Sequence, residues 1–132
     1  MRPIYILTLS ILCVALSACR EKKSASTAAD TQIEWRHTFW NFGEITKGEE
    51  VAHSFYFKNI GKEQLFIKKI ETGCGCTTVK YDQKPISPGK EGKLEILFNS
   101  AGRYGKQYKE IRIFANIPEK QVTLTITANV KE

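Results

Sequence analysis

The feature that most constrains this fold is a strict alternation of apolar and polar residues, which is clearest near the C-terminus. Between residues 121 and 130, one set of alternating positions is apolar: Val122, Leu124, Ile126, Ala128 and Val130. The positions between them are polar: Gln121, Thr123, Thr125, Thr127 and Asn129. Because successive side chains of a β-strand point to opposite faces, this pattern predicts a strand with one buried and one solvated face.

The same pattern recurs in shorter segments, which are separated by turn sequences rich in glycine and proline. A first segment at residues 33–43 bends and restarts, and further segments follow at 51–58, 65–70, 76–79, 94–98 and 108–115. About seven short strands with turns between them predict an all-β, immunoglobulin-like antiparallel β-sandwich, with a barrel as the alternative. Two sheets are needed because a single sheet would leave its apolar face in water.

The large apolar side chains of these segments form the predicted core. They are Trp35, Phe42, Val51, Phe55, Phe57, Leu65, Ile67, Leu94, Ile96, Phe98, Ile111, Ile113, Leu124 and Ile126. Burying one such side chain stabilises a fold by about 1.5–3 kcal/mol. A core of this size is therefore expected to hold the domain together without a disulfide.

The first residues predict export. Residues 4–16 form a mostly apolar run with the length of a signal-peptide core. The run is too short for a membrane-spanning helix, which needs about 20 apolar residues. It ends in Leu16-Ser17-Ala18-Cys19, which resembles the lipobox of bacterial lipoproteins. That resemblance implies cleavage after Ala18 and acylation of Cys19, and an ordinary signal peptide is the alternative.

Three regions follow from this reading of the N-terminus. Residues 1–18 are a predicted lipoprotein signal peptide, and residues 19–31 are a lipidated Cys19 followed by a flexible tether without large apolar residues. Residues 32–132 are the sandwich. Several acyl chains, palmitate among them, anchor a protein stably to a membrane. The predicted location is the bacterial cell envelope, facing the periplasm, because no acidic run follows Cys19. No cofactor is expected apart from the covalent lipid.

The formal net charge of +6 suits contact with anionic lipid, glycan or an acidic protein. The lysines are spread over several segments, which is typical of a solvated surface. No recognition motif points to nucleic acid. The expected partners are therefore the membrane, through the lipid anchor, and an envelope protein or glycan that the sequence does not identify.

The residues with the most reactive side chains are Cys74 and Cys76, which flank Gly75. On an extended strand their Cα atoms would lie about 6.6 Å apart and both side chains would share one face. Three interpretations remain open: packing or a static disulfide, a thiol-redox pair or sensor, and a soft-metal site for copper or zinc. In the metal interpretation His53 is a candidate third ligand, and His37 is the other histidine of the chain.

Other catalytic chemistry is scarce in the sequence. It contains no nucleophile-elbow, zinc-protease or phosphate-loop motif. The predicted function is therefore a non-enzymatic module that binds a protein or envelope component, with the redox or metal protein as the alternative. Trp35, Phe39 and Trp40 form either an aromatic platform for glycan or peptide, or part of the core.

Five motifs in the chain resemble one bacterial family. They are Phe42-Gly43-Glu44-Ile45, His53-Ser54-Phe55-Tyr56-Phe57-Lys58-Asn59-Ile60-Gly61, Cys74-Gly75-Cys76-Thr77, Ile86-Ser87-Pro88-Gly89 and Leu94-Glu95-Ile96-Leu97-Phe98. In these motifs the chain resembles the domain-of-unknown-function (DUF) 1573 family, from about residue 35 to 130. The resemblance implies a small exported or lipid-anchored protein with an Ig-like fold similar to hydin and major sperm protein domains. It implies no activity, because fold alone does not supply one.

Overall fold

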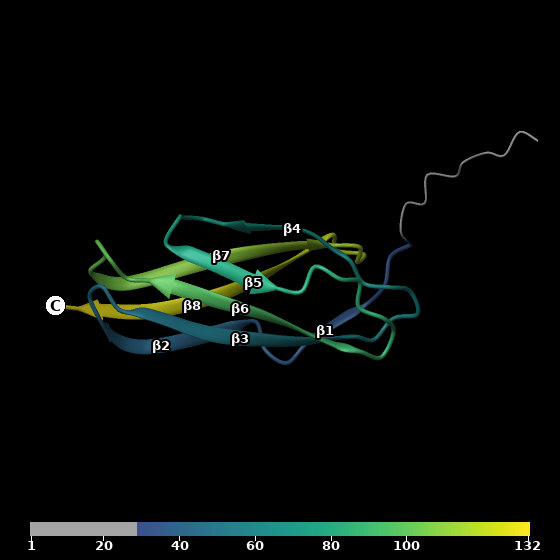
Figure 1. Ribbon diagram of the computed structural model, residues 1–132, viewed down its shortest axis with the longest axis horizontal. Helices are drawn as coiled ribbons and strands as arrows, with labels where there is room; N and C mark the ends of the chain where they lie inside the picture. The colour runs from purple at the N-terminus through teal and green to yellow at the C-terminus, as the bar shows by residue number, and fades with distance from the viewer. Residues whose placement is uncertain (1–28) are drawn as a thin grey trace, which may run out of the picture.

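The computed structural model describes residues 29–132, which form two four-stranded sheets packed face to face (Figure 1). The strands are β1 (Ile33–Trp35), β2 (Phe39–Thr46), β3 (Glu50–Asn59), β4 (Ile67–Thr72), β5 (Thr77–Tyr81), β6 (Glu91–Asn99), β7 (Gly105–Ala115) and β8 (Gln121–Lys131). Within these residues there is no helix long and apolar enough to span a membrane. The predicted signal peptide and Cys19 lie outside the described residues.

The strand order is β1-β3-β6-β5 in one sheet and β2-β8-β7-β4 in the other. This confirms the predicted sandwich, with eight strands in place of about seven. The segment that was expected to bend and restart crosses between the sheets, so β1 pairs with β3 and β2 pairs with β8. The β2–β8 pair is parallel, whereas all other pairs are antiparallel.

The core lies between the two sheets, where the alternating apolar residues predicted it. In β8, Leu124, Ile126 and Val130 are at most 1% exposed. Ten of the predicted core residues are buried, and the other four (Trp35, Phe42, Val51 and Ile67) are half-buried and pack against the cluster from its margins. Ile117 also belongs to the core although it lies in the connection between β7 and β8.

Two fully buried asparagines, Asn59 and Asn116, fasten the connections at one end of the sandwich. The Asn116 side chain accepts a hydrogen bond from the backbone of Phe66 at 2.6 Å and donates to the carbonyls of Ala29 and Gln64 at 2.8 Å. These hydrogen bonds fasten the segment at Ala29 to the sandwich.

Candidate functional site

The two cysteines lie in a tight turn between β4 and β5. These strands are edge strands of opposite sheets, so the turn carries the chain from one sheet to the other. A disulfide joins Cys74 to Cys76, with their Cα atoms 5.2 Å apart. The backbone N–H of Thr77 donates to the carbonyl of Cys74 at 3.4 Å, which closes the turn. The strand expected from Cys76 therefore starts one residue later, at Thr77, because Cys76 belongs to the turn. In this turn the Cα atoms of the two cysteines lie closer together than on an extended chain.

One hydroxyl group lies beside both sulfur atoms. Thr77 is buried, and its Oγ1 is 3.7 Å from Sγ of Cys74 and 3.8 Å from Sγ of Cys76. Because disulfide sulfurs carry no hydrogen, the hydroxyl is the donor in both contacts. Cys76 packs against the core, whereas Gly75 is exposed and has open space around its backbone. Both cysteines are themselves half-buried.

Reducing this disulfide is expected to destabilise the domain only slightly. A covalent loop of three residues constrains the unfolded chain by about 1.5 kcal/mol, half the effect of a 15-residue loop. Denaturant unfolding with and without reductant, and of Cys74→Ser/Cys76→Ser, measures the difference. A loss of more than about 4 kcal/mol would show that the bridge is a structural staple.

The histidines lie away from the cysteine pair, near the β1–β3 edge of the sheet whose other edge is β5. His53 is on β3, with β6 between it and β5, so the fold does not bring His53 to the cysteine pair. Its Nε2 instead lies 2.9 Å from Nε2 of His37, in the connection between β1 and β2. Trp40 stacks on the His53 ring at 3.7 Å with 6° between the planes. Within residues 29–132, no three His, Cys, Asp or Glu side chains are grouped as metal ligands.

The environment of His53 predicts a pH-dependent stability. Partial burial, followed by the charge of nearby His37, lowers the pKa of His53 below its usual 6.5. The unfolded chain therefore binds more protons just below pH 6.5, so the free energy of unfolding should fall as the pH falls through that region. Denaturant unfolding from pH 5 to pH 8, in buffer that contains a metal chelator, measures how the free energy of unfolding changes with pH. His53→Gln should make this change smaller, and an unchanged pH dependence would contradict the assignment.

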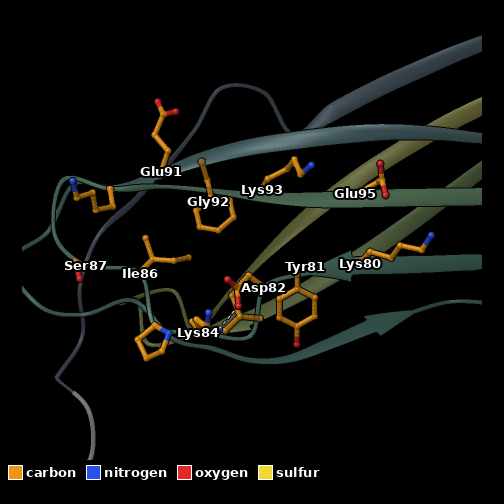
Figure 2. A pocket seen from close by; sticks show the side chains of 14 residues that line it. Lys80, Tyr81, Asp82, Lys84, Ile86, Ser87, Glu91, Gly92, Lys93 and Glu95 are labelled. Atoms are coloured by element: carbon orange, nitrogen blue, oxygen red, sulfur yellow. Dashed lines mark hydrogen bonds between the residues drawn. The ribbon is translucent and has the colours of Figure 1, made fainter.

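A groove of about 650 Å³ lies beside the other end of β5. Figure 2 shows side chains of β6 on one side and those of β5 and the following connection on the other. Tyr81 and Ile86 supply apolar surface. The charged residues that line it are Lys80, Asp82, Lys84, Lys90, Glu91, Lys93 and Glu95.

The groove has four lysines against three carboxylates, a formal excess of one positive charge. One of its three carboxylates is paired with a cation: Glu91 pairs with Arg36 at 3.1 Å. Asp82 accepts the backbone N–H of Lys84 at 3.0 Å, which leaves its charge uncompensated. The ion pairs found among residues 29–132 involve none of the four groove lysines. The groove therefore suits an acidic ligand with some apolar surface.

Strand β5 also presents an unpaired backbone edge next to the groove. It is the last strand of its sheet, with β6 as its one neighbour among the described residues. The N–H of Asn99 donates to the carbonyl of Cys76 at 2.9 Å, and hydrogen-bonded pairs alternate along an antiparallel ladder. Thr78 and Lys80 consequently bond to β6, whereas the N–H and C=O groups of Val79 and Tyr81 point outwards.

A family described as "Protein of unknown function (DUF1573)" matches residues 33–130. The chain belongs to the DUF1573 family. This match confirms the resemblance found in the five motifs. No curated protein matches the chain. Family membership therefore gives the fold and its extent, and leaves the activity to be argued from the site.

The solved structures similar to this DUF1573 domain support the fold alone. A protein of unknown function from Porphyromonas gingivalis W83 is 20% identical, with a TM-score of 0.68 over 83% of this chain. The chain spans about half of that protein, 51% of its length. The ASH/PapD-like domain 7 of human CEP192 is 10% identical, with a TM-score of 0.64 over 78% of this chain and 87% of that one. The secreted serine protease VesC from Vibrio cholerae is 12% identical, with a TM-score of 0.60 over 76% and 23%.

Trp35, Phe39 and Trp40 were expected to form either an aromatic platform or part of the core, and in this DUF1573 domain they differ in burial. Trp35 packs on Phe57, with ring centroids 4.8 Å apart, as a core residue does. Phe39 and Trp40 are 53% and 39% exposed on β2. The pairing of the histidines and the groove beside β5 had no sequence signal, because both depend on residues brought together by the strand order.

Proposed function

We propose that this DUF1573 domain is a lipid-anchored, non-enzymatic binding module of the bacterial envelope, and that it binds an extended acidic segment of a partner protein along β5. The single observation that carries this is the open backbone edge of Val79 and Tyr81 beside the groove. The proposed location in the cell envelope rests on the lipobox-like sequence before Cys19. The tether would let the domain reach partners near the membrane surface.

An added strand explains how one short edge gives both affinity and selectivity. Backbone hydrogen bonds to Val79 and Tyr81 supply affinity that does not depend on partner sequence. Alternate side chains of the partner then enter the groove, where Tyr81 and Ile86 offer apolar contacts. Lysines around the groove favour acidic side chains at those positions and speed association.

Site-specific crosslinking in cells that express the full chain tests this proposal. A photoreactive residue at Gln83 lies in the connection that follows β5. It should give a crosslinked partner that Val79→Pro abolishes, because proline removes an outward N–H. Lys84→Glu/Lys93→Glu should weaken the crosslink through charge reversal, whereas Lys47→Glu/Lys106→Glu, in the β2–β3 turn and on β7, should not.

The crosslinked segment should be extended and acidic when it is mapped by mass spectrometry. Circular dichroism and denaturant unfolding establish that each variant keeps its fold, and the charge-reversal pair remains informative if Val79→Pro does not. Crosslinks that survive both groove variants would show that the partner binds elsewhere. A glycan or lipid recovered in place of a peptide would overturn the choice of ligand.

The disulfide favours a second function, thiol–disulfide exchange with a dithiol partner. A partner thiolate would attack Sγ of Cys74, and the electron pair of the broken S–S bond would leave on Sγ of Cys76. The second thiolate of the partner would then displace Cys74. The partner dithiol is thereby oxidised and the two cysteines are reduced, with two electrons transferred. The Thr77 hydroxyl is placed to donate to the thiolate that forms.

Exchange kinetics with reduced glutathione test the redox function. Thr77→Val should slow reduction several-fold, because one hydrogen bond to the leaving thiolate contributes about 1–2 kcal/mol. Thr78→Val is the matched control, since that side chain is exposed on the other face of β5. Identical rates in all three proteins, or a disulfide that glutathione does not reduce, would exclude this role.

A further inference from the structure

A hollow of about 400 Å³ lies on the outer face of the sheet that does not contain β5. Its floor is β8, with β2 on one side and β7 on the other. Asn41, Thr127 and Tyr108 are in register across these three strands, so their side chains share one face. That face points to solvent, because Ala128, the next residue of β8, belongs to the core.

A β-bulge in β2 shapes one side of the hollow. The register with β8 shifts between Asn41 and Glu44, and Gly43 has a φ of +73° at this point, which glycine adopts without strain. The N–H of Gly43 donates to Oδ1 of Asn41 at 2.9 Å. A Cβ at Gly43 would have nothing within 4 Å. The bulge thus fixes the Asn41 amide and leaves open space beside it.

Two amide side chains at the hollow keep one polar group each for a ligand. Asn41 uses its Oδ1 for Gly43, and Nδ2 of Asn129 lies 3.5 Å from Oε1 of Glu44. In the part of the chain that the structure describes, Nδ2 of Asn41 and Oδ1 of Asn129 are left without such a partner. Between them stands Thr127, whose hydroxyl can both donate and accept. The hollow therefore offers a fixed donor and a fixed acceptor on one face.

An exposed aromatic ring stands beside these polar groups. Tyr108 is 61% exposed, and its hydroxyl donates to Oε1 of Glu110 on the same strand at 3.2 Å, which restrains the ring. Phe39 is 53% exposed on the same face of the sheet, because it lies two residues before Asn41 on β2. Two aromatic rings thus border a surface of hydroxyl and amide groups.

The charge and the size of the hollow favour a small ligand without net charge. Its lining contains one lysine, Lys106, and one carboxylate, Glu44, so the formal charges cancel. Glu44 is also paired with Lys131 at 3.2 Å. Nine residues line the hollow, whereas a protein interface uses about 20–30 residues on each side. This contrasts with the lysine-lined groove beside β5.

We propose that this hollow binds an N-acetylated sugar unit of a neutral glycan chain. The C–H face of the sugar ring packs on Tyr108, and a ring hydroxyl bonds to the hydroxyl of Thr127. The carbonyl and the N–H of the acetamido group match Nδ2 of Asn41 and Oδ1 of Asn129. The neighbouring sugar extends over the sheet towards Phe39. This site is separate from the β5 groove and does not depend on peptide binding there.

Isothermal titration calorimetry of the full-length protein with the β-1,4-linked tetramer of N-acetylglucosamine tests the proposal. Cellotetraose has the same linkage with hydroxyls in place of the acetamido groups, and it should bind about tenfold more weakly. Tyr108→Ala should weaken binding of the acetylated tetramer by about tenfold through loss of the stacked ring. Asn41→Asp keeps the acceptor for Gly43 but loses the donor, and should weaken binding by about fivefold.

Matched variants separate this site from the rest of the surface. Tyr104→Ala removes a ring that is 67% exposed in the β6–β7 connection, outside the hollow, and should leave the affinity unchanged. Tyr108→Phe keeps the ring and should retain most of the affinity. Lys84→Glu/Lys93→Glu, which should weaken the peptide crosslink, should not alter sugar binding. Circular dichroism checks that each variant is folded.

Three results would overturn the sugar site. The first is no binding of the acetylated tetramer to the wild-type protein. The second is equal affinity in the wild-type protein, Tyr108→Ala and Asn41→Asp. The third is equal affinity for cellotetraose, which would remove the acetamido contacts. Each of these results leaves the crosslinking test of the β5 groove unaffected, so the two proposals fail or hold separately.

Discussion

Replacing Asn59 with alanine is expected to lower the free energy of unfolding by about 3–5 kcal/mol, because several buried groups would lose their partner at once. The side chain is fully buried. Its Oδ1 accepts from the Thr31 hydroxyl at 2.9 Å and from the N–H of Gly61 at 3.1 Å. Its Nδ2 donates to the carbonyls of Glu63 and Ile86 at 2.8 and 2.9 Å.

Thermal and denaturant unfolding measure this loss. For a domain of this size each kcal/mol shifts Tm by about 4 °C, so the variant should melt about 12–20 °C lower. Asn99→Ala is the matched control. Its side chain is exposed and accepts one hydrogen bond, from the N–H of Ala101 at 2.8 Å, so the expected loss is below about 1 kcal/mol. Similar losses in both variants would contradict the role assigned to Asn59.

Asn59 also shows where sequence reasoning reaches its limit. The stretch that begins at Asn59 has the composition of a turn, and turns are usually exposed. The side chain is nevertheless buried because the connection near Ile86 and the N-terminal segment at Thr31 fold over it. These segments are 27 and 28 residues away in sequence, so no local pattern contains this information.

The strands themselves could be predicted because their signal is local. In β8, alternation alone placed Leu124 and Ile126 in the core, since neighbouring side chains of a strand must face opposite ways. The same argument said nothing about which strand lies beside which. The parallel pairing of β2 with β8 was therefore missed, as it depends on the crossing between the sheets after Trp35.

The features of the candidate sites also fall into two groups: those that local sequence predicts and those that depend on strand order. Cys74 and Cys76 could be singled out because reactive side chains two positions apart are a local feature, although the strand expected from Cys76 starts at Thr77. The meeting of His37 with His53 could not be predicted, because it requires the β1–β2 connection to lie against β3. The open edge of β5 is likewise a property of strand order.

Replacing Phe55 with alanine is the other change with a large expected effect, about 3–5 kcal/mol. Phe55 is completely buried on β3, and its removal leaves a cavity between two sheets that cannot close over it. Tyr56→Ala is the matched control. That ring is 37% exposed, lies under the Arg36 guanidinium at 5.0 Å, and should contribute less than about 1 kcal/mol.

The Phe55 variant also tests whether the core orders the histidine pair. Its ring contacts both imidazoles, so its loss should free His37 and His53 to move apart. We expect the fall in the free energy of unfolding below pH 6.5 to become shallower, because His53 becomes more hydrated. Measurements at low temperature, where the variant remains folded, separate these effects from unfolding. A variant that loses stability yet keeps the pH dependence of the wild-type protein would show that Trp40 alone holds the His53 ring.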